Sequence, residues 1–206
     1  MIPTAQLSEL PMVDLIIVVS EVLTNLVMQF FRITFLLLSG ILLFSCGEKL
    51  PKPTQKGANT FGCKINGKKW VPDGGGLFSG IKPIRGGFHE ITSFPVYKRG
   101  IFLRTSSQDG QDVEFFLNSW KTGKYSLSTD TQSSPGALYP KDYGYYQSAN
   151  GTTYLTSSRY TGTVTISKAD TATGIVAGTF EFTVGDTKGQ TVKITDGRFD
   201  VNTRTL

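Results

Sequence analysis

The stretch Gly162-Thr163-Val164-Thr165-Ile166-Ser167-Lys168 decides the fold. Val164 and Ile166 occupy every second position between hydroxyl side chains, a period of two that is typical of a β-strand with one buried face. A turn at 169–171 follows, and the alternation then resumes. The next strand is predicted to bury Val176, Gly178, Phe180, Phe182 and Val184. The two segments therefore predict an antiparallel pair of strands.

The last predicted strand changes its inward face part of the way along. Val192 and Ile194 are apolar at even positions, whereas Phe199 and Val201 are apolar at odd positions. Because side chains alternate strictly between the two faces of a strand, one extra residue must be accommodated between these pairs. Asp196-Gly197 is the predicted site of this β-bulge, with the glycine in the left-handed region.

The first predicted strand alternates in the same way. Phe61, Cys63 and Ile65 define its buried face. The strand ends at Asn66-Gly67, a dipeptide that predicts a two-residue type I′ hairpin because both positions tolerate a positive φ angle. Trp70 follows on the return strand and is expected to cover one end of the core.

Two further hairpins are predicted downstream. Residues 96–105 alternate and are expected to pair with 112–119, while residues 143–146 are expected to pair with 152–155. The second of these pairs turns at Asn150-Gly151. For this dipeptide we expect a type I′ turn, as in the first hairpin.

Residues 58–206 are thus predicted to form one all-β domain. The segment suits about ten to twelve strands and shows no helical period. We expect a single antiparallel β-sandwich. The alternative is an up-and-down barrel of lipocalin-like kind, because strands joined mostly by short hairpins fit either architecture.

A continuous apolar run at 33–44 follows Arg32. A bilayer span needs about 20 apolar residues, so this shorter run predicts the h-region of a signal peptide. The signal peptide is placed at 28–45, where Arg32 supplies the positive charge of the n-region.

Residues 1–27 do not look like the start of a signal peptide. They open without a positive charge, and Asp14 and Glu21 interrupt their apolar run. We interpret them as an artefact upstream of a translation start at Met28. The alternative is an amphipathic or membrane-inserted N-terminal helix.

The end of the signal peptide carries a modification motif. Leu43-Phe44-Ser45-Cys46 resembles the lipobox of bacterial lipoproteins. The resemblance implies that Cys46 becomes the first residue and carries a diacylglycerol, and that Gly47 after it directs the protein to the outer membrane. Residues 46–57 contain prolines and charges but little to bury, so they predict a flexible tether. No other cofactor is expected.

Charge and cysteine content limit the partners. The 206 residues include 21 basic and 16 acidic side chains, a formal net charge of +5, and two cysteines. With Cys46 lipidated, Cys63 has no partner, so no structural disulfide is predicted. The basic character suits anionic lipid headgroups or acidic glycans. Nucleic acid is not expected, because the basic residues are scattered and the protein is exported.

Few residues support catalysis or metal binding. His89 is the single histidine, no metal-ligand spacing is present, and no Gly-x-Ser-x-Gly motif occurs. Asp112 and Glu114 share one strand face about 7 Å apart, which fits the carboxylate pair of a glycoside hydrolase. Their alternation with apolar residues favours instead a solvated face. We therefore expect no enzyme, no catalytic residue and no metal.

An aromatic cluster is the strongest candidate for ligand binding. It lies in or beside 129–142, a predicted exposed loop. Its members are Tyr139, Tyr143, Tyr145, Tyr146 and Trp120. Exposed rings on a rigid β scaffold can stack on sugars, because a ring buries a large area at low entropic cost. The alternative is that alternate members face the core and the others cover sheet edges.

Five strand-and-turn segments carry a family resemblance. They are residues 61–70, 122–127, 162–166, 178–182 and 194–199. On these segments the mature region resembles a family of small, uncharacterised Bacteroidetes-type lipoproteins. The resemblance implies a fold and a cellular address, and it brings no known activity or functional residue with it.

These observations together predict a lipid-anchored, non-catalytic protein of the cell envelope at the outer membrane. The favoured hypothesis is a binding module for a glycan or another envelope component. One alternative is a structural or assembly subunit that binds a protein partner through a sheet face or edge. A weaker alternative is a hydrolase that uses Asp112 and Glu114.

Overall fold

The structure is a computed structural model that describes residues 22–30, 32, 49–76, 79–91, 98–131 and 141–206. The chain divides into two compact units, Met1–Glu48 and Lys49–Leu206. In the first unit, residues 22–30 are helical. No helix within the described residues is both long enough and apolar enough to cross a membrane. The predicted h-region, the lipobox with Cys46, and Tyr139 lie outside the described residues.

The second unit is built from antiparallel strands. They are β1 (Thr60–Ile65), β2 (Lys68–Trp70), β3 (Ile84–Ile91), β4 (Lys98–Ser106), β5 (Asp112–Leu117), β6 (Gly123–Ser126), β7 (Tyr143–Gln147), β8 (Thr153–Leu155), β9 (Gly162–Asp170), β10 (Ile175–Gly185) and β11 (Thr191–Asn202). All the hairpins predicted from alternation are present, including β4 with β5 and β7 with β8.

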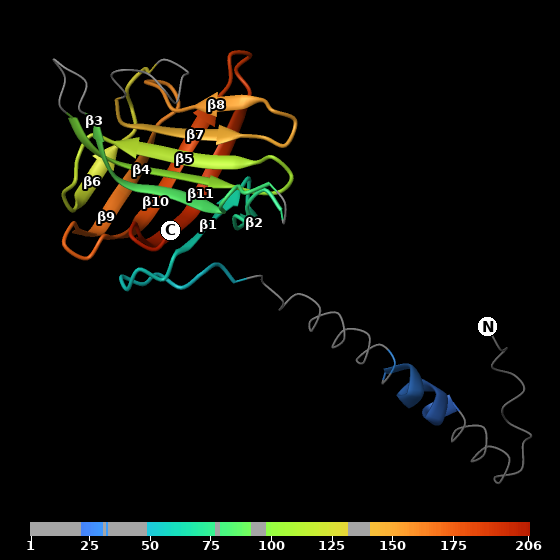
Figure 1. The fold of residues 1–206 in the computed structure, drawn as a ribbon. Coiled ribbons are helices and arrows are strands. Elements are labelled where there is room, and N and C mark those ends of the chain that lie inside the picture. Colours follow the sequence, from blue (N-terminus) through green and yellow to red (C-terminus); the bar gives the residue numbers. More distant parts are fainter. Residues whose placement is uncertain (1–21, 31, 33–48, 77–78, 92–97, 132–140) are drawn as a thin grey trace, which may run out of the picture. The chain divides into compact units, whose positions relative to one another are not determined.

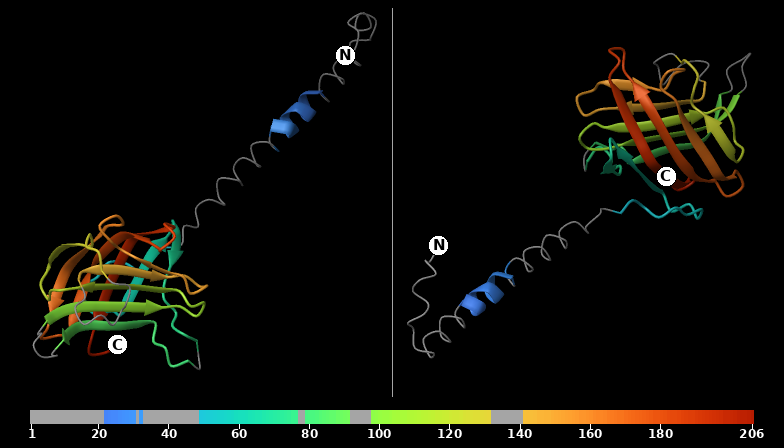
Figure 2. Two further views of the ribbon diagram at one scale, coloured as in Figure 1. Left: turned by 90° about the horizontal axis from the view of Figure 1, so that it is seen from above. Right: turned by 180° about the vertical axis from the view of Figure 1, so that it is seen from behind.

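The strands form one sheet that folds over into two layers (Figure 1). The front layer has the order β3-β4-β5-β7-β8, and the rear layer, seen face-on in the right panel of Figure 2, has the order β6-β9-β10-β11-β1-β2. The layers are continuous because Gly185 of β10 pairs with Leu155 of β8. Among the described strands, β2, β3 and β6 each pair on one side only, so the sheet is open. The predicted all-β, sandwich-like class is confirmed, and the closed barrel is not formed.

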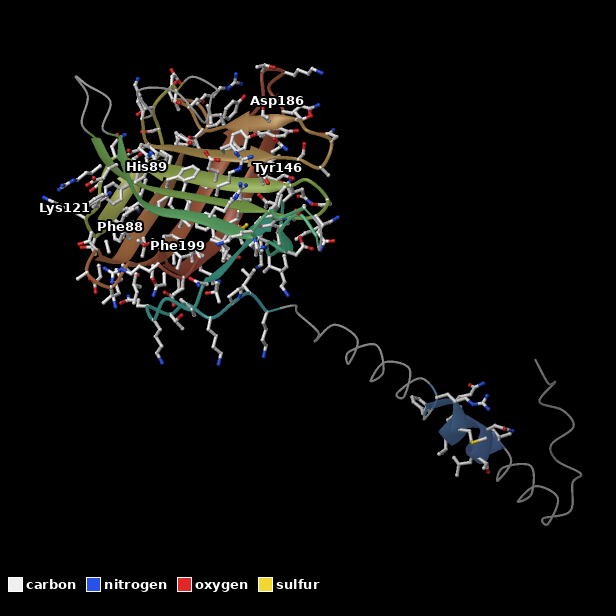
Figure 3. The ribbon with its side chains drawn as sticks, in the orientation of Figure 1. Phe88, His89, Lys121, Tyr146, Asp186 and Phe199 are labelled. Carbon is white, nitrogen blue, oxygen red and sulfur yellow. The ribbon has the colours of Figure 1, made fainter. Side chains whose placement is uncertain are left out.

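Phenylalanine rings from both layers fill the space between them. The ring of Phe180 on β10 lies 5.0 Å from Phe61, 5.7 Å from Phe115 and 6.3 Å from Phe199. Figure 3 labels Phe199, which belongs to this core. Burying one such side chain contributes about 1.5–3 kcal/mol, so this cluster is a main source of stability.

The two Asn-Gly turns differ. Asn66 and Gly67 both have positive φ angles, 49° and 81°, which confirms the type I′ turn between β1 and β2. The same prediction for Asn150-Gly151 is wrong, because only the glycine has a positive φ. Ser148 donates its N–H to the carbonyl of Thr152. The result is a three-residue loop whose glycine takes the left-handed position.

The predicted β-bulge is present in β11, but its left-handed residue is not the glycine. Phe180 pairs with Gly197 and Phe182 pairs with Ile194, so one extra residue lies between them on β11. Asp196 has φ of 54°, whereas Gly197 is not in the positive-φ region. Gly197 is required for a different reason: a Cβ there would lie 2.5 Å from the Phe180 ring.

Residues 49–58, hereafter the strap, lie on the β domain. Thr54 donates its hydroxyl hydrogen to the buried carboxylate of Asp200 on β11. The N–H groups of Lys56, Gly57 and Ala58 donate to the same carboxylate at 3.0, 2.7 and 3.3 Å. This corrects the expectation of a flexible tether for the described residues up to Gly57. Local composition could not show that a residue far along the chain supplies their acceptor.

Candidate functional site

The predicted aromatic cluster is buried rather than exposed. Tyr143, Tyr145 and Tyr146 all lie on β7, and each is only 5–6% exposed. Tyr146, labelled in Figure 3, belongs to the main core. Tyr143 and Tyr145 belong to a second cluster with Phe116. The expectation of exposed stacking rings is therefore wrong for these three residues, and the alternative, that alternate members face the core, describes Tyr146.

The second cluster encloses a buried charged network. Glu114 on β5 is fully buried and accepts the hydroxyl hydrogen of Tyr143 on one oxygen. Its other oxygen lies 3.7 Å from Nε of Arg104 and has no hydrogen bond. Arg104 also bonds Asp112 through Nε at 3.1 Å. Burial raises the pKa of Glu114, although Tyr143 and Arg104 oppose that rise.

This network changes the interpretation of Asp112 and Glu114. They share one face of β5, as predicted, but the face is not solvated: Asp112 is 7% exposed and Glu114 is fully buried. Aromatic neighbours and Arg104 cover it, which a single-strand pattern cannot reveal. Both carboxylates form ion pairs with Arg104, and neither lines the three pockets described below. This geometry does not resemble an open hydrolase cleft with two free carboxylates.

Trp120 and His89 have separate positions. The Trp120 indole donates its N–H to the carbonyl of Gly100 at 2.8 Å, and its ring packs edge-on against Phe88. The Arg99 guanidinium lies 4.8 Å from the centre of the same ring. His89 is exposed on β3. Trp120 is therefore half-buried against the main core, and it does not belong to the second cluster with Tyr143 and Tyr145.

A pocket of about 280 Å³ lies where the two layers join. Tyr145 of β7, Tyr154 and Leu155 of β8, and Gly185 of β10 line it, together with Tyr160 from the following loop. Gly185 and Leu155 are the residues through which β8 pairs with β10. Because β8 and β10 pair through this one pair of residues, the two strands diverge beside it and leave space.

Tyr160 forms one wall of the pocket. A Cβ on Gly185 would lie 2.1 Å from the Tyr160 ring, so the ring rests directly on the backbone of β10. Ser157 fixes the loop, because its N–H donates to the carbonyl of Tyr160 at 2.8 Å and its Oγ accepts the Tyr160 N–H at 3.1 Å. The guanidinium of Arg159 lies 5.5 Å from the ring centre. The position of Tyr160 is thus fixed by backbone contacts.

Two carboxylates line the rim. Asp130 accepts the N–H of Ser158 at 2.8 Å and its hydroxyl hydrogen at 3.0 Å, and these bonds lower the pKa of Asp130. Asp186, labelled in Figure 3, accepts the N–H groups of Lys188 and Gln190 at 2.9 and 2.7 Å. Within the described chain, the hydrogen bonds to Asp186 all end on Oδ1. Its Oδ2 is therefore available to a ligand.

The pocket combines aromatic walls with hydrogen-bonding groups at its rim. Rings cover the apolar face of a small ligand, while carboxylates accept hydrogen bonds from its hydroxyl groups. Of the predicted site residues that the structure describes, only Tyr145 lines this pocket. Tyr160, Asp130 and Asp186 were missed, because they come from three separate turns with no shared spacing. Only the pairing of β8 with β10 brings them together.

Two wider grooves lie over the outer face of the rear layer. One, of about 420 Å³, is lined by Pro53 of the strap and by Lys124, Thr165, Thr179 and Arg198. The other, of about 520 Å³, is lined mainly by serine and threonine. Neither contains an exposed aromatic wall. Across the described residues, no group of three or more His, Cys, Asp and Glu side chains is placed to hold a metal ion.

Comparisons with known proteins return one family. A model described as a domain of unknown function (DUF6252) matches residues 94–201, slightly more than half of the chain. The match contains β4 to β10 and most of β11, and therefore all the described residues that line the pocket. It leaves out the strap and β1 to β3. No curated protein and no solved structure matches the chain.

Proposed function

Because the chain belongs to the family of the domain of unknown function DUF6252, whose description names no activity, we propose a function from the geometry of the β domain. The protein is a non-catalytic binding module that takes a glycan or a similar polyhydroxylated molecule in the pocket between β8 and β10. It is attached to the cell envelope, at the outer membrane, by a lipid on Cys46. The ligand is bound rather than converted.

The pocket with its tyrosine wall is the observation that carries this proposal. Tyr160 rests on Gly185 and lines the pocket, so its ring is placed where a sugar could stack on it. Asp186 stands at the rim with Oδ2 available, and a sugar hydroxyl is a suitable donor for it. The volume of about 280 Å³ is just below the range of about 300–1,000 Å³ that is common for ligand sites. A small unit of a glycan is thus the fitting occupant.

The carboxylates of the pocket support the non-catalytic part of the proposal. The two that line this pocket already serve its loops, Asp130 through Ser158 and Asp186 through the β10–β11 turn. The pKa of Asp130 is lowered, which suits a hydrogen-bond acceptor and not a general acid. A buried carboxyl with a raised pKa does exist in Glu114, but it belongs to the network with Tyr143 and Arg104.

A thermal-shift screen of the full chain in detergent micelles, against envelope and dietary glycans, tests the binding proposal. A ligand at 100 times its Kd adds about 2.7 kcal/mol, which raises the Tm of a domain of this size by about 5–10 °C. Tyr160→Ala should remove the shift, because it removes the wall of the pocket. Tyr125→Ala is the matched control, since Tyr125 is half-buried on β6 and does not line the pocket.

Loss of the shift in both variants, or in neither, would contradict binding at this site. No shift with any glycan would favour the alternative of an assembly subunit with a protein partner, to be sought by crosslinking in the intact envelope. The anchor is tested separately by the intact mass of the membrane-bound protein. A mass that shows an unmodified Cys46 would refute the lipid attachment.

A further inference from the structure

The strap presents two different sides. Its inner side is fixed at several points: Pro51 packs against Gly62, where a Cβ would lie 2.7 Å from its ring, and Thr54 bonds Asp200. The carbonyl of Gln55 accepts a hydrogen bond from Nζ of Lys168 at 3.2 Å. These contacts hold the backbone against the outer face of the rear layer along most of its length.

The outer side of the strap is basic. Lys49, Lys52 and Lys56 are all exposed, and residues 49–58 contain no acidic side chain. Side chains tipped with nitrogen project from this segment away from the sheets (Figure 3). The carboxylate of Asp200, beneath the strap, is only 1% exposed. The fixed backbone therefore aims three cations in a common outward direction.

The strap begins very close to the proposed lipid. Leu50 is only four positions after Cys46 and already contacts the domain near Gly62. A chain of that length spans at most about 14 Å. A domain attached in this way cannot turn freely above a membrane, because the strap must stay near the headgroups whatever the domain does.

We propose that the strap is a membrane-docking surface, with Lys49, Lys52 and Lys56 binding the headgroups of anionic lipids and thereby fixing the orientation of the β domain. The inference rests on the proposed lipid attachment at Cys46. Anionic headgroups attract each lysine near the surface and lose that attraction in high salt. Asp200 acts as a positioning residue, since it holds the backbone that carries the three lysines.

The orientation that results suits the proposed pocket. The β10–β11 hairpin, which carries Asp186, lies at the end of the β domain opposite the strap (Figures 1 and 3). When the strap contacts a membrane, the pocket faces away from it. A ligand in the surrounding medium then reaches Tyr160 without passing between the domain and the bilayer.

Lysine footprinting of the full chain tests the proposal. The chain is reconstituted in vesicles of phosphatidylcholine alone or with phosphatidylglycerol, labelled with an amine-reactive reagent and analysed by mass spectrometry. The three strap lysines should be protected about fivefold by phosphatidylglycerol, the factor that corresponds to about 1 kcal/mol for each lysine. Protection should disappear in 1 M salt. Lys121 and Lys188, exposed elsewhere on the domain, serve as internal controls and should react equally in both vesicles.

Equal labelling of the strap lysines in the two kinds of vesicle would overturn the docking surface and leave the lipid anchor standing. The strap lysines could instead react more slowly than Lys121 and Lys188 to the same degree in both vesicles and in 1 M salt. That result would also overturn the proposal, because the group that protects them would not be an anionic headgroup. Protection that requires an added acidic polysaccharide would replace the lipid with a glycan. A chain that does not remain on the vesicles would refute the anchor and the docking surface together.

Discussion

The hydroxyl of Thr54 donates a hydrogen bond to the carboxylate of Asp200 across 146 residues of sequence. Asp200 lies on the outer face of β11 and also accepts hydrogen bonds from three backbone N–H groups of the strap. This single carboxylate joins the segment that enters the β domain to the last strand. The entry of the chain is therefore part of the folded unit.

Asp200→Asn should destabilise the β domain by about 2 kcal/mol, because hydrogen bonds to a charged acceptor contribute about 1.5–3 kcal/mol. Burial alone would raise the pKa of Asp200, but its four donors lower it below the ordinary value of 3.8. The stabilisation is thus present above pH 3.8 and is lost as the pH falls through the folded-state pKa. Denaturant unfolding of wild type and variant between pH 3 and pH 7 measures the difference.

The matched control is Glu181→Gln, which removes one negative charge from an exposed position on β10. Its unfolding free energy should stay within about 0.5 kcal/mol of wild type. If the gap between wild type and Asp200→Asn stayed constant down to pH 3, the carboxylate would not be the group that holds the strap.

Alternation in the sequence predicted the strands because burial on one face is a local property of each strand. It placed the β9–β10 hairpin, the Asn66-Gly67 turn and the irregularity in β11. It did not predict the strap, whose apolar content is low and whose partner, Asp200, is remote. Almost any residue type can donate a hydrogen bond through its backbone N–H, so these contacts cannot be recognised from the residue types of the strap. Its composition alone therefore predicted a flexible segment.

The bulge in β11 gives a second prediction: substitutions at two adjacent residues should differ in their effect on stability. Gly197→Ala should destabilise the protein by about 1–3 kcal/mol, the usual range for overpacking, because the new Cβ would meet the Phe180 ring at 2.5 Å. Asp196→Gly should be tolerated, since glycine adopts the φ of 54° without strain and only the exposed ion pair with Lys64 is lost. Thermal unfolding of both variants checks this. If Gly197→Ala unfolded at the same temperature as wild type, the close approach of Phe180 would not be the reason for the glycine.

The candidate site was less predictable than the fold. The cluster on β7 consists of tyrosines whose hydroxyls find partners within the domain, as Tyr143 does with Glu114, so an abundance of tyrosine did not indicate exposed rings. The pocket depends on Tyr160 and Gly185, which meet only because β8 pairs with the end of β10. That pairing follows from the way the sheet folds over, and no single segment encodes it.

Glu114 gives a third prediction, with a pH dependence opposite to that of Asp200. Burial raises the pKa of Glu114 above its ordinary value of 4.5. Its contribution to stability is therefore fully present below pH 4.5 and is lost as the pH rises through the folded-state pKa. Glu114→Gln cannot ionise, so the Tm of this variant should rise relative to wild type between pH 4.5 and pH 7.

Tyr143→Phe provides the directional control for this prediction. The Tyr143 hydroxyl donates to Glu114 and opposes the rise of its pKa. Without that donor the pKa of Glu114 in the folded protein should be higher still, so the loss of stability that begins above pH 4.5 should continue to a higher pH. A Tm difference between wild type and Glu114→Gln that does not change with pH would show that Glu114 titrates as an ordinary carboxyl.

The last prediction uses Gly185 to move the wall of the pocket without removing any of its functional groups. The φ of Gly185 is not in the positive region, so alanine suits the backbone there, but its Cβ would lie 2.1 Å from the Tyr160 ring. Gly185→Ala must displace the ring and should abolish the thermal shift by a glycan ligand. Gly189→Ala is the control: its φ is 81° and nothing lies within 4 Å of the added Cβ, so it strains the backbone by about 1–2 kcal/mol without touching the pocket. Both variants should therefore unfold at a lower temperature than wild type, yet only Gly189→Ala should keep the ligand-induced shift. If Gly185→Ala also kept it, the ligand would not contact the Tyr160 ring, and the grooves on the outer face of the rear layer would be the next place to seek it.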